Sequence, residues 1–331
     1  MAGAHRARRA ILLRPGEIPG GDRAREVRPM RLVSYGPRGA EQPAVMVDDD
    51  RLLPVAPVLA RHGIRSGGWA DLLGSWELIA PILEAALRAP DAEAVVLREG
   101  TRLGAPVTRP STVVAIGFNY ADHGGDVLGA PPPVGDPVVF LKTVTSVSGP
   151  EDEIIAPPET AQLDYEVELA VVIGRGGRRI AVADASRHIA GYMIANDVSA
   201  RDVAFGAGTD HPLLFQIARA KGFPTFCPTG PWILTPDEVP DAGDLGMALS
   251  VNGELRQKSS TARMTVRIPE LISSVSASME LRPGDVLLTG TPPGCGFQQD
   301  PPAYLRDGDV VEAWIEGLGR MRTPVRAESS S

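Results

Sequence analysis

The chain has 331 residues, of which 43% are hydrophobic and 22% charged, so it is long and apolar enough to fold around a sizeable core. Its formal net charge of -8 argues against a nucleic-acid-binding protein, which needs a basic face, and against attachment to a membrane surface, so small molecules are the expected partners. Cys227 and Cys295 form neither a disulfide framework nor a zinc pattern, and no apolar run is long enough to span a membrane, which predicts a cytoplasmic protein.

The first third of the chain predicts a tail and a small domain. Residues 1–29 contain seven arginines and no apolar periodicity, so we expect them to form a disordered tail, and residues 327–331 to form a short one. Residues 30–105 predict a small α/β domain, because the hairpin pattern of residues 30–55 precedes apolar residues at helical spacing between Trp69 and Leu87. No residue pattern in this domain points to catalysis.

Residues 107–326 predict a second, mainly β domain. Apolar segments beside turn signals predict strands at residues 113–117, 164–173, 189–195, 247–251, 286–289 and 310–315. The pair Asn252-Gly253 is typical of a two-residue hairpin turn, and apolar spacing between Ile268 and Met279 predicts a helix. Strands and helices do not alternate regularly, which argues against a doubly wound sheet or a TIM barrel. The expected fold class is therefore α+β, mainly β.

The segment DYEVELAVVIG, residues 164–174, contains the most informative pattern. Side chains alternate along a strand, so Glu166 and Glu168 would share one face, about 6.6–6.8 Å apart along the chain and close enough to meet at one cation. The segment continues as a purely apolar run, and carboxylates that enter a core need neutralisation, which a divalent cation can provide. Ordinary glutamates on a solvated sheet face are the alternative.

Asp197 supplies a third carboxylate at the end of the apolar segment 191–195, although it could instead cap the following turn. Three carboxylates favour Mg²⁺ or Mn²⁺, or Ca²⁺ in a roomier cage. The chain has only three lysines against thirty arginines. Because a buried ammonium shifts its pKa as a guanidinium cannot, Lys142, Lys221 and Lys258 are candidate functional residues, unless they are surface residues retained by chance.

Two loops add further candidates. In GFNYADHGGD, residues 117–126, Asp126 follows His123 by three residues and could orient its imidazole while it takes a proton from water, although a surface histidine is the alternative. The segment GTPPGCG, residues 290–296, could hold a substrate carboxylate through its amides and the Thr291 hydroxyl, or be a plain loop. The chain contains no G-x-S-x-G motif, which argues against a serine hydrolase.

Together these segments resemble the fumarylacetoacetate hydrolase family over residues 107–326. The matching segments, in family order, are GFNYADH, VVFLKT, LDYEVELAVVIG, IAGYMIANDVSARD, RAKGFPTFCPTGPWI, VNGELRQ, LRPGDVLLTGTPPGCG and YLRDGDVVEAWIEGLG. The resemblance implies a mixed β-roll or β-sandwich core, usually a homodimer, with Mg²⁺ or Mn²⁺ held by Glu166, Glu168 and Asp197. It also implies a small keto acid or 1,3-diketone as substrate.

The resemblance further implies roles for individual residues. His123 and Asp126 would activate water, and Lys221 would lie beside the developing oxyanion. Arg201 would anchor either the ligand strand or the substrate. The residues expected to contact the substrate are Phe118, Tyr120, Lys142, Arg201, Ala204, Gly290 and Thr291.

Several positions depart from the family pattern, including a longer segment than expected at residues 205–215 and Pro224 in place of a common Asp. Asp126 stands where Glu is usual, Phe118 where acylpyruvate-cleaving members often have Arg, and Ala204 where they often have Gln. The last two replace polar contacts and indicate a bulkier or more apolar substrate than oxaloacetate or fumarylpyruvate. The leading hypothesis is a divalent-metal-dependent hydrolase of a C–C bond in a 1,3-diketo or acylpyruvate-type acid. The alternatives are a decarboxylase, tautomerase, isomerase or dehydratase on the same site and, third, a noncatalytic metal-stabilised binding protein.

Overall fold

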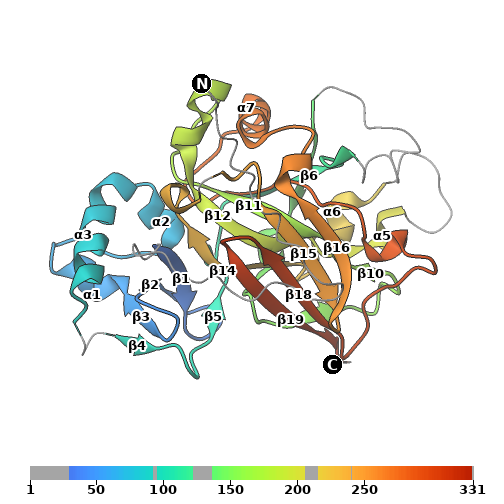
Figure 1. Ribbon diagram of the computed structural model, residues 1–331, viewed down its shortest axis with the longest axis horizontal. Coiled ribbons are helices and arrows are strands. Elements are labelled where there is room, and N and C mark those ends of the chain that lie inside the picture. The colour runs from blue at the N-terminus through green and yellow to red at the C-terminus, as the bar shows by residue number, and fades with distance from the viewer. Residues whose placement is uncertain (1–29, 92–94, 122–135, 206–214, 240, 330–331) are drawn as a thin grey trace, which may run out of the picture.

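The computed structural model of the chain describes residues 30–91, 95–121, 136–205, 215–239 and 241–329 (Figure 1). The predicted tail at residues 1–29 lies outside the described residues, as do His123 and Asp126. Strands predominate over helices, which confirms the predicted α+β, mainly β fold class. Within the described ranges, no helix is long and apolar enough to cross a membrane.

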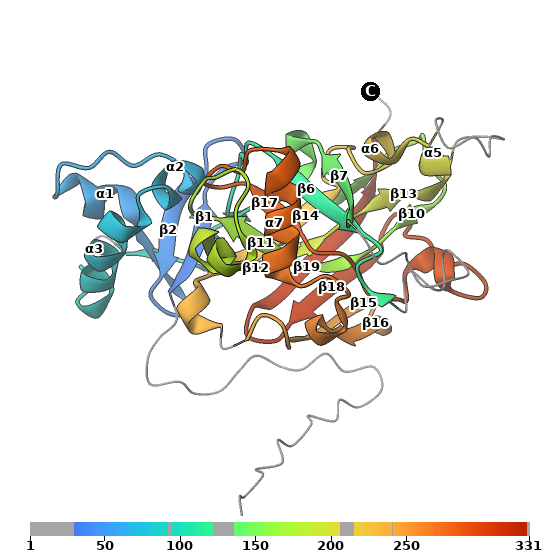
Figure 2. The ribbon, with the colours of Figure 1, turned by 90° about the horizontal axis from the view of Figure 1, so that it is seen from above.

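Most of the described strands join one twelve-stranded sheet in the order β4-β3-β2-β1-β14-β12-β11-β17-β6-β7, with β5 beside β1 and β8 beside β14 (Figures 1 and 2). Its strands are β1 (Arg31–Tyr35), β2 (Gln42–Met46), β3 (Arg51–Pro54), β4 (Val96–Leu97), β5 (Leu103–Gly104), β6 (Val113–Gly117), β7 (Val138–Lys142), β8 (Val147–Ser148), β11 (Val167–Ile173), β12 (Ile189–Asn196), β14 (Cys227–Leu234) and β17 (Val286–Leu288). Because β1 pairs with β14, the amino-terminal strands extend this sheet. The division into two domains at residues 105–107 stays a prediction.

A second sheet of five strands has the order β16-β15-β18-β19-β9, and a third consists of the short pair β10 and β13. Their strands are β9 (Ile154–Ala156), β10 (Leu163–Asp164), β13 (Ser199–Ala200), β15 (Gly246–Val251), β16 (Glu254–Ser260), β18 (Val310–Ile315) and β19 (Gly319–Ala327). The turn between β15 and β16 has positive φ at Asn252 and Gly253, which confirms the predicted hairpin.

The helices lie at the ends and outer faces of the sheets. Figure 2 shows α1 (Val55–Ala60), α2 (Trp69–Leu73) and α3 (Trp76–Arg88) together at one end of the molecule. The single helical segment expected from Trp69 to Leu87 is thus two helices, separated at Gly74 and Ser75. The predicted helix from residue 268 is confirmed as α7 (Ile268–Ser278), and two short helices, α5 (Arg201–Phe205) and α6 (Ile217–Ala220), lie beside each other.

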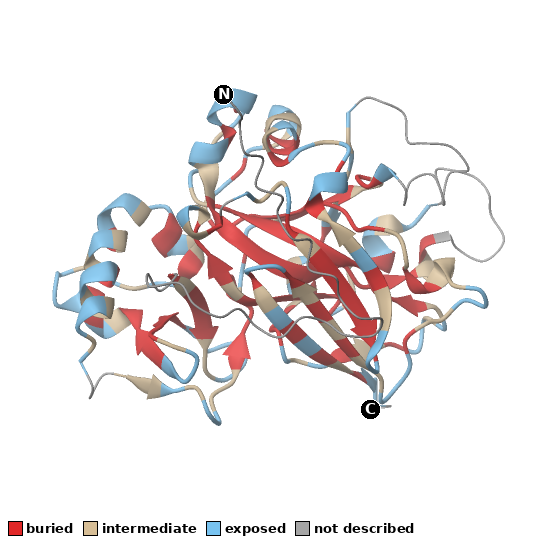
Figure 3. Cartoon of the chain, viewed as in Figure 1, coloured by how far each residue is buried: buried red, intermediate tan, exposed pale blue. Residues whose placement is uncertain are grey.

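Strand β11 is buried on both faces, as the continuous red of the central strands in Figure 3 illustrates. Its odd-numbered residues from Val167 to Ile173 pack in a core shared with β15, β18 and α7, whereas Ala170 and Val172 pack in a second core shared with α1–α3. Each face therefore meets apolar layers, which explains why the sequence becomes wholly apolar after Glu168.

The strand predicted over residues 164–173 is interrupted. Asp164 ends β10, which pairs with β13, and the ladder with β12 begins only at Val167. Side chains replace the missing ladder bonds, because Asn196 Oδ1 accepts from the Glu166 N–H at 2.9 Å and Gln257 Oε1 accepts from the Val167 N–H at 2.9 Å. The strict alternation expected from Asp164 onward is therefore wrong before Val167.

Candidate active site

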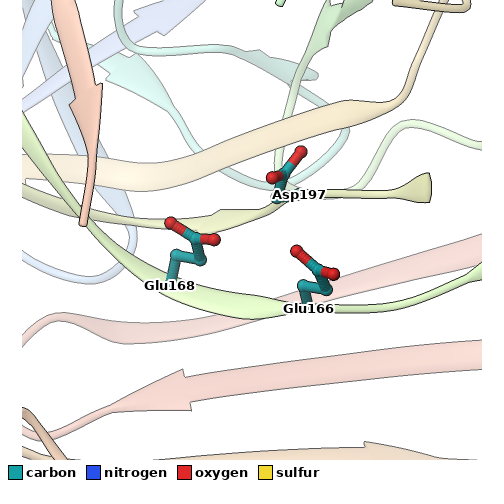
Figure 4. Close-up of side chains that lie close together, drawn as sticks. All are labelled: Glu166, Glu168 and Asp197. Atoms are coloured by element: carbon teal, nitrogen blue, oxygen red, sulfur yellow. The ribbon is translucent and has the colours of Figure 1, made fainter. Parts of the chain in front are cut away.

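Three buried carboxylates meet where β11 begins and β12 ends (Figure 4). Antiparallel pairing puts Val167 opposite Asn196, so Asp197 follows β12 directly beside Glu166, whose carbonyl oxygen accepts from the Asp197 N–H at 2.9 Å. Glu166, Glu168 and Asp197 each offer an oxygen atom, and these three atoms lie within 4.8 Å of one another. All three side chains are buried, which rules out the alternative of glutamates on a solvated sheet face.

Three cations surround these carboxylates. Lys221 Nζ donates to Glu166 Oε2 at 2.8 Å and to Asp197 Oδ2 at 2.6 Å. Lys142 Nζ lies 2.6 Å from Asp197 Oδ1, and Arg201 contacts Glu166 Oε1 at 2.5 Å and Asp164 Oδ2 at 2.8 Å.

We refer to these seven side chains as the charge cluster: Asp164, Glu166, Glu168, Asp197, Lys142, Lys221 and Arg201. Its four carboxylates and three cations leave one net negative charge when all are ionised.

That excess charge falls on Glu168. Among the described residues no cation forms an ion pair with it, and its Oε2 accepts only from the Gly290 N–H, at 2.7 Å. Burial, followed by the charges of Asp197 and Glu166, raises the pKa of Glu168 well above its ordinary value. A buried carboxylate in this position is stabilised by a proton or by a further cation.

Lys221 and Arg201, the two cations that pair with Glu166, remain charged. Burial lowers the pKa of Lys221, but Asp197 and Glu166 raise it by more, so its net shift is upward. The pKa of Arg201 is likewise raised, since Glu166 and Asp164 outweigh its desolvation. Lys221 therefore supplies positive charge and hydrogen bonds, and it is not a base at neutral pH.

The donor set fits a hard divalent cation. Three buried carboxylate oxygens within one small volume are ligands that Mg²⁺, Mn²⁺ and Ca²⁺ take, and the cluster includes neither histidine nor cysteine, which zinc prefers. Burial raises the pKa of Cys227 to about 12 and that of Cys295 well above its ordinary value, so both thiols are protonated. A divalent metal site best explains why three carboxylates are buried so close together.

The segment 290–297 closes the cluster on a second side. Gly290 has φ +98°, and a Cβ atom there would lie 2.8 Å from Asn119 Cβ, so only glycine fits. Asp164 accepts from the Gly296 N–H at 2.6 Å and from the Phe297 N–H at 3.2 Å, which ties the segment to the carboxylate that also pairs with Arg201. The predicted substrate loop and the predicted ligand strand therefore lie together.

The Thr291 hydroxyl already forms two hydrogen bonds within the protein. It donates to the Val167 carbonyl at 3.0 Å and accepts from Gln257 Nε2 at 2.9 Å. Among the described residues, the Thr291 N–H has no hydrogen-bond partner. The backbone amide of Thr291 is thus the better-placed donor for a substrate carboxylate.

The other residues predicted to contact the substrate lie in different surroundings. The Lys142 side chain is fully buried, and its ammonium also donates to the carbonyls of Lys221 and Val198. The Tyr120 hydroxyl donates to Met247 Sδ inside the core, and Ala204 is buried in α5. Phe118 has a left-handed backbone, with φ 56°. Their substrate roles stay predictions.

Several residues at the site were missed from the sequence. Asn119 links the segment after β6 to the ends of two other segments. Its Nδ2 donates to the Thr289 carbonyl at 2.8 Å, and its Oδ1 accepts from the Val266 N–H. Two aromatic rings contact the cations: the Phe140 centroid lies 5.1 Å from Lys221 Nζ, and that of Phe297 lies 4.4 Å from Arg201 Cζ. The sequence signal for Gln257 was its place in the VNGELRQ segment.

Comparison with known proteins identifies the family. The family model described as "Fumarylacetoacetate (FAA) hydrolase C-terminal" matches residues 112–326. The chain belongs to the fumarylacetoacetate hydrolase family. It is therefore an enzyme of a family that includes hydrolases, tautomerases and isomerases, and the predicted resemblance is confirmed.

Members of this family with different named reactions are similar to the chain. "Oxaloacetate tautomerase FAHD2B, mitochondrial" from Bos taurus is 48% identical over 215 residues, which cover 65% of this chain and 66% of that protein. "2,4-didehydro-3-deoxy-L-rhamnonate hydrolase" from Sphingomonas sp. (strain SKA58) is 39% identical over 297 residues, 89% of this chain and 96% of that protein. A crystal structure of maleylpyruvate hydrolase from Sphingobium sp. SYK-6, in complex with manganese(II) and pyruvate, matches the chain with a TM-score of 0.72 at 30% identity, covering 91% of this chain and 100% of that chain.

Proposed function

We propose that the chain is a divalent-metal-dependent hydrolase that cleaves a C–C bond of a 1,3-diketo or acylpyruvate-type acid through an enolate. The observation that carries the proposal is Glu168, a buried carboxylate that no described cation neutralises, beside two cations fixed in position. Glu166, Glu168 and Asp197 would hold Mg²⁺ or Mn²⁺, which when bound supplies positive charge at the keto oxygen of the substrate.

The residues of the chain bind and orient the acid. The guanidinium of Arg201 uses Nε and Nη2 on Asp164 and Glu166, which leaves Nη1 for a substrate carboxylate, together with the Thr291 N–H. Lys221, kept protonated by Asp197 and Glu166, stabilises the negative charge that develops on the enolate oxygen.

Water delivery rests on the histidine and aspartate predicted from the sequence. His123, oriented by Asp126, removes a proton from water, and the water oxygen bonds to the distal carbonyl carbon. The C–C bond then breaks, and its electron pair remains on the 2-oxo acid fragment as the enolate. That fragment takes up a proton, so the products are a carboxylic acid and a 2-oxo acid with one added water between them.

The surroundings of the cations favour a substrate with an apolar group. Phe140 and Phe297 place ring faces beside Lys221 and Arg201, and Phe118 and Ala204 are apolar where related acylpyruvate-cleaving enzymes often have polar residues. We therefore expect acylpyruvates with apolar acyl groups to be used in preference to oxaloacetate.

A tautomerase is the second candidate. The relative from Bos taurus, 48% identical, is named as an oxaloacetate tautomerase, and tautomerisation needs enolate stabilisation without attack by water. The charge cluster serves both reactions equally. The decarboxylase, isomerase and dehydratase alternatives share this feature, and the homodimer and the cytoplasmic location also stay predictions.

The test is turnover by the purified protein with Mg²⁺, Mn²⁺ or EDTA, on acylpyruvates, fumarylpyruvate and oxaloacetate, with products identified by mass. Two acid fragments that together carry one added water are expected, and only with metal. His123→Ala should lower hydrolysis by about 10²–10⁴-fold, whereas His62→Ala, an exposed histidine of the amino-terminal region, should not. Unchanged mass with a shifted ultraviolet spectrum would instead establish the tautomerase.

A further inference from the structure

Gln257 is a fully buried side chain that bridges the metal-ligand strand and the loop after β17. Its Oε1 accepts from the N–H of Val167, the residue between Glu166 and Glu168, at 2.9 Å. Its Nε2 donates to Thr291 Oγ1 at 2.9 Å and to the Pro292 carbonyl at 2.8 Å. A carboxamide, with one acceptor and two donor hydrogens, satisfies all three contacts at once.

These contacts form a closed ring of hydrogen bonds. The Val167 N–H donates to Gln257, Gln257 donates to the Thr291 hydroxyl, and that hydroxyl donates to the Val167 carbonyl at 3.0 Å. The direction of the ring is fixed, because a carbonyl can only accept and the hydroxyl has a single proton. Bonds in such a ring reinforce one another in a buried site.

We propose that Gln257 is a positioning residue that sets the Thr291 amide relative to the three carboxylates and so controls the binding of a 2-oxo acid carboxylate. The inference rests on the proposed function, which assigns that amide to the substrate. The Gly290 N–H already donates to Glu168. In this proposal the neighbouring Thr291 N–H binds the substrate, so two successive amides of one loop bind a metal-site carboxylate and the substrate carboxylate. The Thr291 hydroxyl acts inside the ring and makes no direct contact with the substrate.

The experiment compares Gln257→Leu, Thr291→Val, the double variant and Thr291→Ser. Gln299→Leu is the matched control, because Gln299 Nε2 donates to the Gly294 carbonyl at 2.9 Å in the same loop and makes no bond to β11. Calorimetry measures the dissociation constant of Mn²⁺ alone and then that of pyruvate on the Mn²⁺-loaded protein. Thermal unfolding checks that each variant is folded.

Gln257→Leu and Thr291→Val should each weaken pyruvate binding by about tenfold, the loss of one to two buried hydrogen bonds. The double variant should bind pyruvate no more weakly than Gln257→Leu does, since each change breaks the same ring of hydrogen bonds. Thr291→Ser should keep the wild-type value, and Gln299→Leu should stay within about twofold of it. The Mn²⁺ dissociation constant should change less than about threefold throughout, because Lys221 and Arg201 still hold Glu166.

Several results would overturn the inference. These are wild-type pyruvate affinity in Gln257→Leu, an equal loss in Gln299→Leu, or losses that multiply in the double variant. Should Gln257→Leu not fold, the contrast between Thr291→Val and Thr291→Ser decides the matter. Turnover is not the readout, so a chain that binds pyruvate as described and hydrolyses no acylpyruvate refutes only the proposed reaction.

Discussion

Replacing Lys142 with Met should destabilise the protein far more than removing another lysine. The Lys142 side chain is fully buried, its Nζ lies 2.6 Å from Asp197 Oδ1, and it donates to the carbonyls of Lys221 at 2.6 Å and Val198 at 3.3 Å. Met preserves the length and apolar stem of the side chain, so the change removes the ammonium and little volume.

The expected cost follows from the charge cluster. Without Lys142, the cluster has two uncompensated negative charges, and Asp197 retains only its bond to Lys221. Removing one partner of a buried ion pair costs about 3–5 kcal/mol. At about 2–4 °C per kcal/mol for a chain of this size, the melting temperature should fall by about 6–20 °C.

The assay is thermal unfolding with EDTA and with Mg²⁺. Lys258→Met is the control, because Lys258 is exposed on β16, and its melting temperature should stay within about 1–2 °C of wild type. Mg²⁺ should restore part of the loss in Lys142→Met, since a bound cation offsets the missing charge. A Lys142→Met protein as stable as Lys258→Met, with only a raised KM, would refute this reasoning and support the substrate contact predicted from the sequence.

Three further changes test other parts of the site. Because the pKa of Glu168 is raised in the folded protein, the metal-free protein should lose stability as the pH rises from the ordinary pKa of 4.5 through the raised pKa. The free energy of unfolding should fall by at most about 1.4 kcal/mol per pH unit in that range. Urea unfolding in EDTA should show this dependence in the wild type and not in Glu168→Gln. The buried Tyr165 hydroxyl has no hydrogen-bond partner among the described residues, so Tyr165→Phe should leave stability equal or raise it by about 1 kcal/mol in urea unfolding. Gly290→Ala should lower stability by at least about 1 kcal/mol and weaken metal binding, because its Cβ would clash with Asn119 and disturb the amide that bonds Glu168; a variant with wild-type melting temperature and Mn²⁺ affinity would contradict this.

The carboxylate triad could be predicted from the sequence because its signals are local. Glu166 and Glu168 precede a run of apolar residues, and Asp197 follows another, so each lies where a buried strand begins or ends. The geometry between them could not be predicted. The Glu166 and Val167 amides are satisfied by side chains 30 and 90 residues away, and no periodicity within a strand reports such contacts.

The sequence predicted Arg201 as an anchor of the ligand strand or the substrate, but it did not predict the carboxylate partners of the two buried lysines. The scarcity of lysine marked Lys142, Lys221 and Lys258 alike, although Lys258 is exposed. Which carboxylate Lys142 and Lys221 face depends on how β7, α6 and β12 meet in space. Asp164 shows the same limit. It seemed part of an alternating strand, yet it is the carboxylate that joins Arg201 to the amides of Gly296 and Phe297.

The charge cluster alone does not separate a hydrolase from a tautomerase. A divalent cation would change the net charge of the cluster from -1 to +1, and the carboxylate of a bound 2-oxo acid would then neutralise it. This charge balance stabilises an enolate whether it forms by C–C cleavage or by tautomerisation. Among the residues of the cluster, Lys221 and Arg201 remain protonated, three of the four carboxylates pair with cations, and the fourth, Glu168, is assigned to the metal, so the proposed function leaves none of them to act as the base for water. The choice between the two reactions therefore depends on His123 and Asp126, which is why the histidine variant is the decisive measurement.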